Sequence, residues 1–394
     1  MDRNTREFAG ISAAGLLLYF SYSVSRSPII PLFARSLGAS PLLVGWIVAA
    51  STITGIFVKL PAGTLSDRFG RRALLIAGAC FFAITPFLYA GVATVGALIF
   101  VRVLHGNATA IFSPTSSAAI SDITDPGRRG VRMGLYASVQ GVGQALGPTL
   151  GGALISLSGF HLPFLVSGVI GTVGLACVLL TVRQVSENRA ERRRTRVLEG
   201  IKEVFRSRPI LATSSTVASM MVVVGSYNGF FPLYAAEVLR FDPWQIGTIF
   251  TIQTTTTLLA RPLMGRFSDS VGRKPLIVGA LFWSSLLIAS LPHLQTPLHL
   301  FVFAGAWGLG VSVVSSVAGA LITDIARSSH YGAAHGTFGS IYDTGEALGP
   351  ILAGIMVTHL GYGVMFLSLG VFLALCTTGF AATTFKPIAS FTAN

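Results

Sequence analysis

The sequence predicts an all-α polytopic membrane protein with twelve transmembrane helices, arranged as two pseudo-symmetric bundles of six. Three observations predict this class: a composition poor in charge, apolar runs of membrane-spanning length along the whole chain, and an internal repeat. Of the 394 residues, 52% are hydrophobic and only 11% are charged. That is too little charge to cover the surface of a soluble protein of this size.

Twelve apolar runs are long enough to cross the hydrocarbon core of a bilayer, which takes about 20 residues of helix. We expect them at residues 8–33, 41–63, 73–92, 94–119, 132–156, 162–182, 210–236, 244–265, 275–292, 297–322, 333–358 and 362–385. The charged N-terminal segment MDRNTREF is followed by no small-residue cleavage site, so no removable signal peptide is expected. The three cysteines fall inside the runs without metal-ligand spacing, so no metal site is expected.

The basic residues lie mainly on one side of the predicted membrane. Most of the 28 Lys and Arg residues fall on the side that holds both termini and the loops from even to odd spans. Because cytoplasmic loops carry the excess of positive charge, we expect a multi-pass protein of the inner (plasma) membrane with both termini in the cytoplasm. The net charge of +13 then reflects topology, and no nucleic-acid partner is expected.

The longest polar segment, residues 183–208, separates six spans from six. Its apolar residues recur at helical spacing with Arg and Lys between them, which is typical of a short helix lying on anionic membrane lipids. The predicted domains are an N-terminal bundle at 1–182, this basic cytoplasmic linker at 183–208, and a C-terminal bundle at 209–394.

The two halves repeat each other at a fixed offset of 202 residues. GTLSDRFGRR at 63–72 is matched by GRFSDSVGRK at 265–274, and ALGPTLGG at 145–152 by ALGPILAG at 347–354. Landmarks that hold one register imply two structurally equivalent halves. A repeat of this kind places a binding site between the halves near the midplane, with access that alternates as one half rocks against the other.

These motifs resemble those of the major facilitator superfamily over almost the whole chain. GTLSDRFGRR resembles the superfamily's loop signature between its second and third spans, and RVLHGNATA at 102–110 resembles its fourth-span motif. GQALGPTLGG at 143–152 is similar to the fifth-span pattern of its proton-coupled antiporters. The resemblance implies the major facilitator fold, a small-molecule substrate, export of the drug:proton antiporter type, and a proton gradient in place of any bound cofactor. We expect a monomer.

Two sets of residues follow from these motifs. The gate and loop motif combines glycines that permit tight turns with charges that anchor the loop, and the resemblance implies that it latches the halves in the outward-facing state: Gly63, Asp67, Arg68, Gly70, Arg71, Arg72, Asp122, Gly265, Asp269, Gly272, Arg273 and Asp324. The helix-packing motif combines glycines that let two helix backbones approach with prolines that bend the helix: Gly143, Gly147, Pro148, Gly151, Gly152, Gly349 and Pro350. Because two close-packed, bent helices suit a seal, we expect this motif between the halves.

Two carboxylates stand deep in the eleventh span, in the stretch IYDTGEALGP. Asp343 and Glu346 are three residues apart and share one helix face. Their repeat mates are the uncharged Gly141 and Gln144, so the shared scaffold does not require the charge. Ionisable residues inside a membrane mark ion or substrate pathways, and we expect one of the two to carry the coupling proton. The alternative is that they only neutralise a buried arginine.

The remaining candidates are cations and cavity-lining side chains. Arg102 stays protonated, so it can tune a carboxylate or hold an anionic substrate group, and Arg26 stands near aromatic residues in a cavity-lining span. Lys59 and Arg261 are expected to snorkel to the cytoplasmic interface and not to bind substrate. The cavity is expected to contain Tyr22, His105, Gln144, Tyr227, Asn228 and Tyr342.

The sequence therefore predicts a secondary active transporter that expels a small organic or drug-like solute in exchange for protons. One alternative keeps transport but changes the cargo to an organic anion, such as a carboxylate, sugar acid or siderophore, held by arginines. Another is a membrane sensor without coupled transport. No enzyme is expected, because no nucleophile–base constellation, phosphate loop or metal cluster stands at interpretable spacing.

Overall fold

The computed structural model describes residues 3–182, 207–326 and 331–383, without the side chains of a few residues, Asp67 among them. These ranges consist of helices and the turns that join them, and contain no strand. The predicted linker helix lies outside the described residues.

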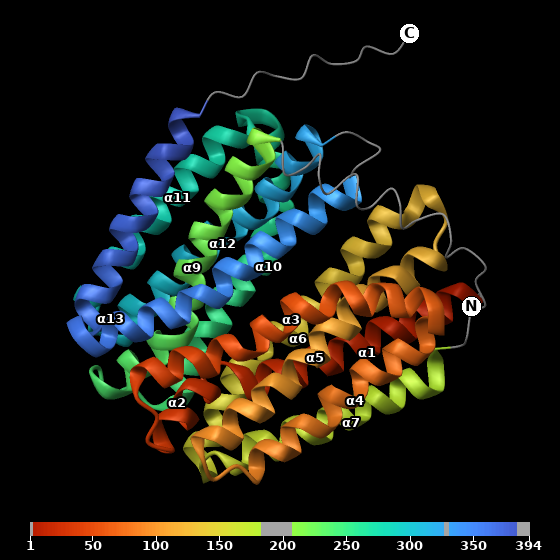
Figure 1. Ribbon diagram of the computed structural model, residues 1–394, viewed down its shortest axis with the longest axis horizontal. Helices are drawn as coiled ribbons and strands as arrows, with labels where there is room; N and C mark the ends of the chain where they lie inside the picture. The colour runs from red at the N-terminus through yellow and green to blue at the C-terminus, as the bar shows by residue number, and fades with distance from the viewer. Residues whose placement is uncertain (1–2, 183–206, 327–330, 384–394) are drawn as a thin grey trace.

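The helices fall into two sets on either side of residues 183–206 (Figure 1). The first set is α1 (Arg3–Arg26), α2 (Ile29–Ser36), α3 (Pro41–Phe69), α4 (Arg71–Ala90), α5 (Val95–Asp122), the 3-10 turn η1 (Pro126–Arg128), α6 (Arg129–Ser158) and α7 (His161–Thr181). The second set is α9 (Arg208–Glu237), α10 (Pro243–Val271), α11 (Arg273–Ser290), the 3-10 turn η2 (Leu291–His293), α12 (Pro297–Ile325) and α13 (Tyr331–Ala382).

The twelve predicted spans correspond to these helices. Helices α1 and α2 together form the first span, and α13 contains the last two, which meet where Gly361 departs from helical geometry with φ of 77°. Within the described ranges, nine segments meet both the length and the hydropathy expected of a membrane span, and α13 counts once among them. Helices α6 and α10 are 30 and 29 residues long but fall outside this set.

Helices α6 and α10 are less apolar than the other spans, and they face each other between the bundles. Each packs on the other over much of its length, and α3 packs on α13 in the same way. The run TIQTTTTLL of α10 and the glutamines of α6 therefore face protein and cavity more than lipid. A hydropathy threshold misses helices of this kind, whereas length and repeat register find them.

The repeat extends to the helix ends. Gly70 lies between α3 and α4 with φ of 87°, and its repeat mate Gly272 lies between α10 and α11 with φ of 94°. This left-handed backbone favours glycine strongly. At the N-terminus of α5 the Thr94 hydroxyl accepts a hydrogen bond from a backbone N–H, and Thr296 does the same for α12, 202 residues on. Residues related by the repeat therefore mark the boundaries of helices that are related by the repeat.

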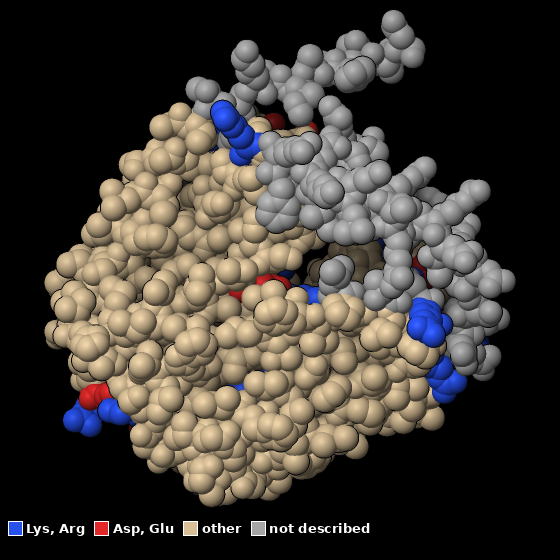
Figure 2. All heavy atoms as spheres, in the orientation of Figure 1, with Lys and Arg blue, Asp and Glu red and all other residues tan. Residues whose placement is uncertain are grey.

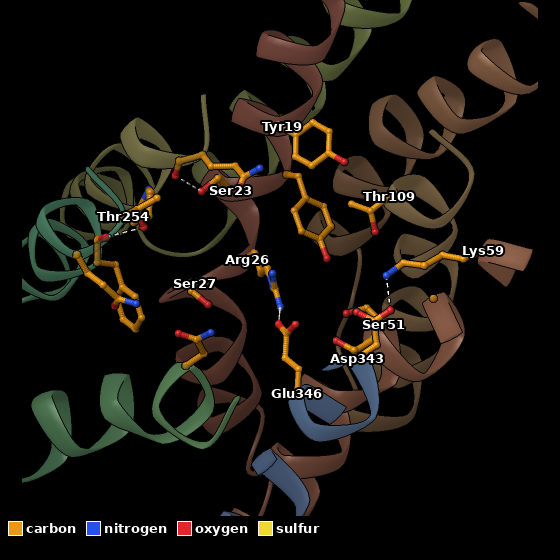
Figure 3. Close-up of a pocket in the computed structure, with 18 residues that line it drawn as sticks. Tyr19, Ser23, Arg26, Ser27, Ser51, Lys59, Thr109, Thr254, Asp343 and Glu346 are labelled. Atoms are coloured by element: carbon orange, nitrogen blue, oxygen red, sulfur yellow. Dashed lines mark hydrogen bonds and ion pairs between the residues drawn. The ribbon is translucent and has the colours of Figure 1, made fainter. Parts of the chain in front are cut away.

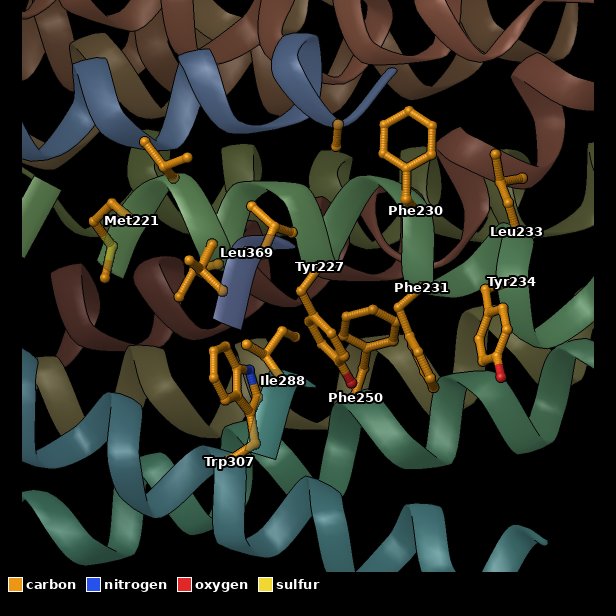
Figure 4. Close-up of a cluster of buried hydrophobic side chains, with 14 of the residues drawn as sticks. Met221, Tyr227, Phe230, Phe231, Leu233, Tyr234, Phe250, Ile288, Trp307 and Leu369 are labelled. Atoms are coloured by element: carbon orange, nitrogen blue, oxygen red, sulfur yellow. The ribbon is translucent and has the colours of Figure 1, made fainter. Parts of the chain in front are cut away.

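The ends of the molecule differ in packing. We call the end with the turns at Gly70 and Gly272 the basic face, and the end with residues 37–40 and 238–242 the opposite face. The largest buried apolar cluster crosses between the bundles near the opposite face, through α2 and the start of α3. Within the second bundle it contains a stack of aromatic rings around Tyr227 (Figure 4). Apolar burial therefore holds the bundles together at that end.

Candidate functional site

A cavity of about 320 Å³ lies between the two bundles. Helices α1, α3, α5 and α6 line it from the first bundle, and α9, α10 and α13 line it from the second. Figure 2 shows a hollow between the bundles with acidic and basic side chains in it. The volume falls in the range of small-molecule sites, and the position is the one predicted from the repeat.

Glu346 of α13 forms an ion pair across the cavity with Arg26 of α1 (Figure 3). The Glu346 Oε1 atom accepts a hydrogen bond of 2.7 Å from Nη2 of Arg26. The guanidinium also lies over the ring of Tyr22, 5.6 Å from its centroid. Because α1 and α13 belong to different bundles, this pair joins the two halves at the level of the cavity.

Asp343, one turn away on α13, pairs with Lys59 of α3 (Figure 3). The ammonium group of Lys59 donates to Oδ2 of Asp343, and both residues line the cavity. The expectation that Lys59 snorkels away from the site is wrong. Its position four residues before the loop motif suggests an interfacial lysine, but α13 crosses α3 there and places the carboxylate of Asp343 within reach.

Arg102 of α5 has no carboxylate partner among the described ion pairs. The residue is 1% exposed, and its guanidinium donates to the carbonyls of Ile47 and Val48 and to the hydroxyl of Ser51, all on α3. It does not line the cavity, although Ser51 does. Its contacts in this state tie α5 to α3 within one bundle, one layer behind the cavity wall.

The predicted cavity residues divide into two groups. Tyr22, Gln144 and Asn228 line the cavity. The other three stand behind its wall: buried His105 meets the hydroxyl of Tyr89 at 3.2 Å, half-buried Tyr342 packs on Phe338, and buried Tyr227 stacks on Phe231 with ring centroids 4.8 Å apart (Figure 4). Tyr227 adjoins Asn228 in sequence, but consecutive residues of a helix point in different directions.

Several cavity residues were missed, and the repeat relates some of them to one another. Four pairs of lining residues are repeat mates at the offset of 202: Arg26 and Asn228, Ser51 and Gln253, Thr52 and Thr254, Gln144 and Glu346. The offset leads to Gln253 only from Ser51, which was not itself predicted, so neither residue could be reached from the predicted candidates. The cavity is thus pseudo-symmetric in position and asymmetric in charge.

Four glycines let the bundles touch between the cavity and the opposite face. Gly45 lies against the backbone of Pro350, and its repeat mate Gly247 lies against that of Pro148. The packing-motif residue Gly152 meets Pro243 in α10 in the same way, and Gly354 meets Pro41 in α3. A Cβ at any of these glycines would overlap backbone atoms of the other bundle.

The remaining glycines of the packing motif serve a different contact. Gly143, Gly147 and Gly151 bring α6 against α1 within the first bundle, and Gly349 brings α13 against α9 within the second. Small residues at this spacing allow close backbone approach. Helix α6 therefore uses one face for its own bundle and another, through Gly152, for the interface.

An ion pair lies beyond this contact, at the opposite face. Nε of Arg35 donates to Oε1 of Glu237 at 2.6 Å, and the Tyr362 hydroxyl donates to the other oxygen at 2.8 Å. Arg35 and Glu237 are repeat mates. The opposite face is thus held by backbone contact inside and by charge at its rim.

The charged residues of the loop motif pair within their own bundles. Arg71 meets Asp122 at 2.9 Å, and the mirrored Arg273 meets Asp324 and also Asp269. None of these described pairs crosses between the halves, so the predicted latch is not formed by them in this conformation, and the side chain of Asp67 lies outside the described part. In Figure 2 the hollow lies near this end.

The other arginines of the motif also make contacts within the first bundle. Arg72 donates to the carbonyl of Leu179 at 3.3 Å, and exposed Arg68 lies over the ring of Phe69. Gly63 and Gly265 lie within helices, and no described atom stands within 4 Å of a Cβ built on either one. The tight turn expected at Gly63 is therefore not found, because α3 continues past it to Gly70.

Two repeat-related bundles of apolar helices around a polar cavity, packed shut on one side, define the architecture of a membrane transporter. The chain belongs to the Major Facilitator Superfamily, whose model matches residues 11–252 and 220–389. Multidrug resistance protein 1 of Bacillus subtilis is 25% identical over 335 residues, 84% of this chain and 84% of that protein. Multidrug resistance protein MdtG of Escherichia coli is 23% identical over 355 residues, 86% of this chain and 85% of that protein.

Solved structures show the same fold. The nucleoside transporter NupG superposes with a TM-score of 0.79 at 15% identity, covering 97% of this chain and 99% of that one. A bacterial homologue of the human lysosomal transporter Spinster, in an inward-facing and unoccupied conformation, superposes with a TM-score of 0.78 at 14% identity, covering 96% of both chains. The predicted class, a transporter and not an enzyme, is confirmed.

Proposed function

We propose that this transporter expels a small organic solute in exchange for protons, driven by the proton gradient across the inner membrane. The observation that carries the proposal is the pair of carboxylates on α13. Asp343 and Glu346 line the cavity and each binds a cation of the other bundle. The protonation of a carboxylate in this position depends both on a solute in the cavity and on the distance to its cationic partner in the other bundle.

The coupling follows from the partners of the two acids. Protonation of Glu346 removes the charge that holds Arg26, and protonation of Asp343 removes the charge that holds Lys59. Because each pair joins α13 to the first bundle, protonation weakens a link between the halves. Loss of such a link shifts the balance between two conformations by the free energy of the link.

The outward direction is supported by the packing motif and by the relatives. GQALGPTLGG contributes Gly152 to the contact between bundles that shuts the cavity from the opposite face. The similar proteins of Bacillus subtilis and Escherichia coli are multidrug resistance proteins. With the basic face in the cytoplasm, as the distribution of Lys and Arg predicts, the cavity lies on the side from which an exporter loads. We propose a monomer in the lipid bilayer with both termini cytoplasmic.

The test is solute flux in proteoliposomes under an imposed pH gradient. Candidate solutes come from a screen for compounds to which overexpression of the protein makes a sensitive strain resistant. We expect Asp343→Asn or Glu346→Gln to abolish exchange driven by the gradient while solute binding persists. Gln140→Glu is a matched control, because Gln140 lies one turn from Gln144 on α6 and outside the cavity lining. Wild-type exchange in both acid variants would overturn the assignment of the proton site, and binding without any flux in the wild type would indicate a sensor.

A second candidate function is transport of an organic anion. It is favoured by the two cations of the cavity, Arg26 and Lys59, which a substrate carboxylate can hold once Glu346 or Asp343 is protonated. Thermal stabilisation of the purified protein by anionic and cationic panels separates the two functions. Loss of anion binding in Arg26→Gln, with cations inactive in the wild type, would favour the anion transporter.

A further inference from the structure

The cavity contains three side-chain carboxamides that the protein leaves unengaged. Gln144 of α6, Asn228 of α9 and Gln253 of α10 all line it, and none of these amides has a hydrogen-bond partner among the described residues. Gln253 is 8% exposed, and its Oε1 atom is buried without a partner. A buried polar atom of this kind costs free energy unless a ligand or water satisfies it.

The charges of the described residues that line the cavity cancel. Its two acids and two bases are joined as Arg26–Glu346 and Lys59–Asp343, so the lining carries no net charge that would select a cation or an anion. A lipophilic cation would need a carboxylate released from its partner, and an anion would need a free guanidinium or ammonium group. Neither is present while both pairs are formed.

The rest of the lining is also polar. Of the eighteen described residues that line the cavity, only Gly55, Pro148 and Phe250 lack a polar side chain. Sites for drug-like molecules are mostly apolar, with a few polar groups that set orientation. This cavity reverses that proportion, and an apolar solute would leave its amides and hydroxyls unpaired.

The repeat separates the charged residues from two of the free amides. Asn228 is the mate of Arg26 and Gln144 is the mate of Glu346, so the pseudo-symmetric positions hold a salt bridge in one case and two neutral amides in the other. A solute bound to the amides leaves the Arg26–Glu346 pair intact. Binding of the solute and coupling to protons can then depend on different residues of one cavity.

We propose that the cavity binds a small polar solute without net charge, whose adjacent hydrogen-bond donors and acceptors engage Gln144, Asn228 and Gln253. A carboxamide offers one acceptor and one donor group side by side, so it matches hydroxyl-rich molecules and the donor–acceptor edges of amides and heterocycles. The cavity volume of about 320 Å³ limits the solute to a small one. This inference names the substrate class for the transporter proposed above and rests on that function, but binding itself requires no proton coupling.

The test is thermal stabilisation of the purified full-length protein, without a pH gradient, by three sets of probes. Glucose, uridine and nicotinamide are polar and uncharged, tetraphenylphosphonium is a lipophilic cation, and gluconate is an anion. We expect stabilisation by at least one uncharged probe and by neither ion. Stabilisation by tetraphenylphosphonium or gluconate alone, or by no uncharged probe, overturns the proposal.

Three variants locate the binding groups. Gln253→Leu and Asn228→Leu are expected to weaken binding of the active probe at least tenfold, and Gln140→Leu, whose amide bonds to Tyr136 outside the cavity, is expected to leave it unchanged. If Gln253→Leu does not fold, Gln144→Leu at a half-buried position gives the same answer. Unchanged binding in the folded amide variants overturns the proposal. If the protein binds the probe but shows no flux driven by a pH gradient, the proposed proton coupling is wrong and the proposed substrate class is unaffected.

Discussion

The packing of Gly45 predicts how one added methyl group shifts the balance between the two conformations of the transporter. A Cβ on Gly45 would lie 3.0 Å from the carbonyl carbon of Pro350 and 3.1 Å from Cα of Ile351, and closer still to the Pro350 oxygen. These are backbone atoms of a helix, so the overlap is relieved only if α13 moves away from α3. Gly45→Ala therefore opposes the closed state of the opposite face.

The magnitude follows from the cost of overpacking, which is about 1–3 kcal/mol for extra methylenes in a well-packed interface. This cost falls on the state in which α3 touches α13 at Gly45 and is absent when these ends separate. It therefore changes the ratio of the two states directly. A difference of about 1–3 kcal/mol corresponds to a shift of about 5- to 150-fold toward the state that is open at the opposite face.

The assay is the distribution of distances between spin labels at exposed Ser36 and Val238, measured by double electron–electron resonance in a cysteine-free background. These positions stand at the opposite-face ends of α2 and α9, one on each bundle. Gly96→Ala is the control, because no described atom lies within 4 Å of a Cβ at that position. If Gly45→Ala gives the same distance distribution as Gly96→Ala, the steric reasoning is refuted.

Three further predictions follow from single contacts. Tyr227→Phe removes a buried hydroxyl without a described partner, so we expect the melting temperature to stay unchanged or rise by the equivalent of about 1 kcal/mol, with transport retained; a marked fall would reveal a hidden partner. Arg35→Gln breaks the partly exposed pair with Glu237, which is worth about 0.2–1 kcal/mol. The population of the state open at the opposite face, read from the spin-label distances, should therefore change less than fivefold, and less still in high salt. Asp122→Asn breaks the pair with Arg71 inside one bundle and should lower the melting temperature without moving the bundles apart; a changed distance between bundles would argue for a latch.

Much of the fold could be predicted from the sequence because a membrane constrains it so strongly. Backbone groups in hydrocarbon must be satisfied internally, so apolar runs of about 20 residues are helices. The repeat offset then relates the two halves, and it holds down to single contacts: Arg71–Asp122 recurs as Arg273–Asp324. The break at Gly361 falls where the sequence places the boundary between the last two spans.

The candidate site could be predicted in part. Asp343 and Glu346 stand out as acids in an apolar span, and both line the cavity. Their partners do not follow from sequence, because the reach of Lys59 depends on where α3 crosses α13. Arg102 belongs to a motif and is fully buried, but its hydrogen bonds go to backbone and hydroxyl oxygens of α3.

By itself, the sequence determined the class of protein, its helices, its two-fold repeat and the acids between the halves, since these depend on composition, periodicity and register along the chain. The tertiary structure decided which cations hold those acids and that the buried oxygen of Gln253 has no partner among the described residues. It also decided that Gly45 and Gly247 pack against Pro350 and Pro148 of the other bundle. The physical reason is that ion pairs, hydrogen bonds and backbone contacts depend on separations of a few ångströms between helices. Those separations are set only when the helices pack.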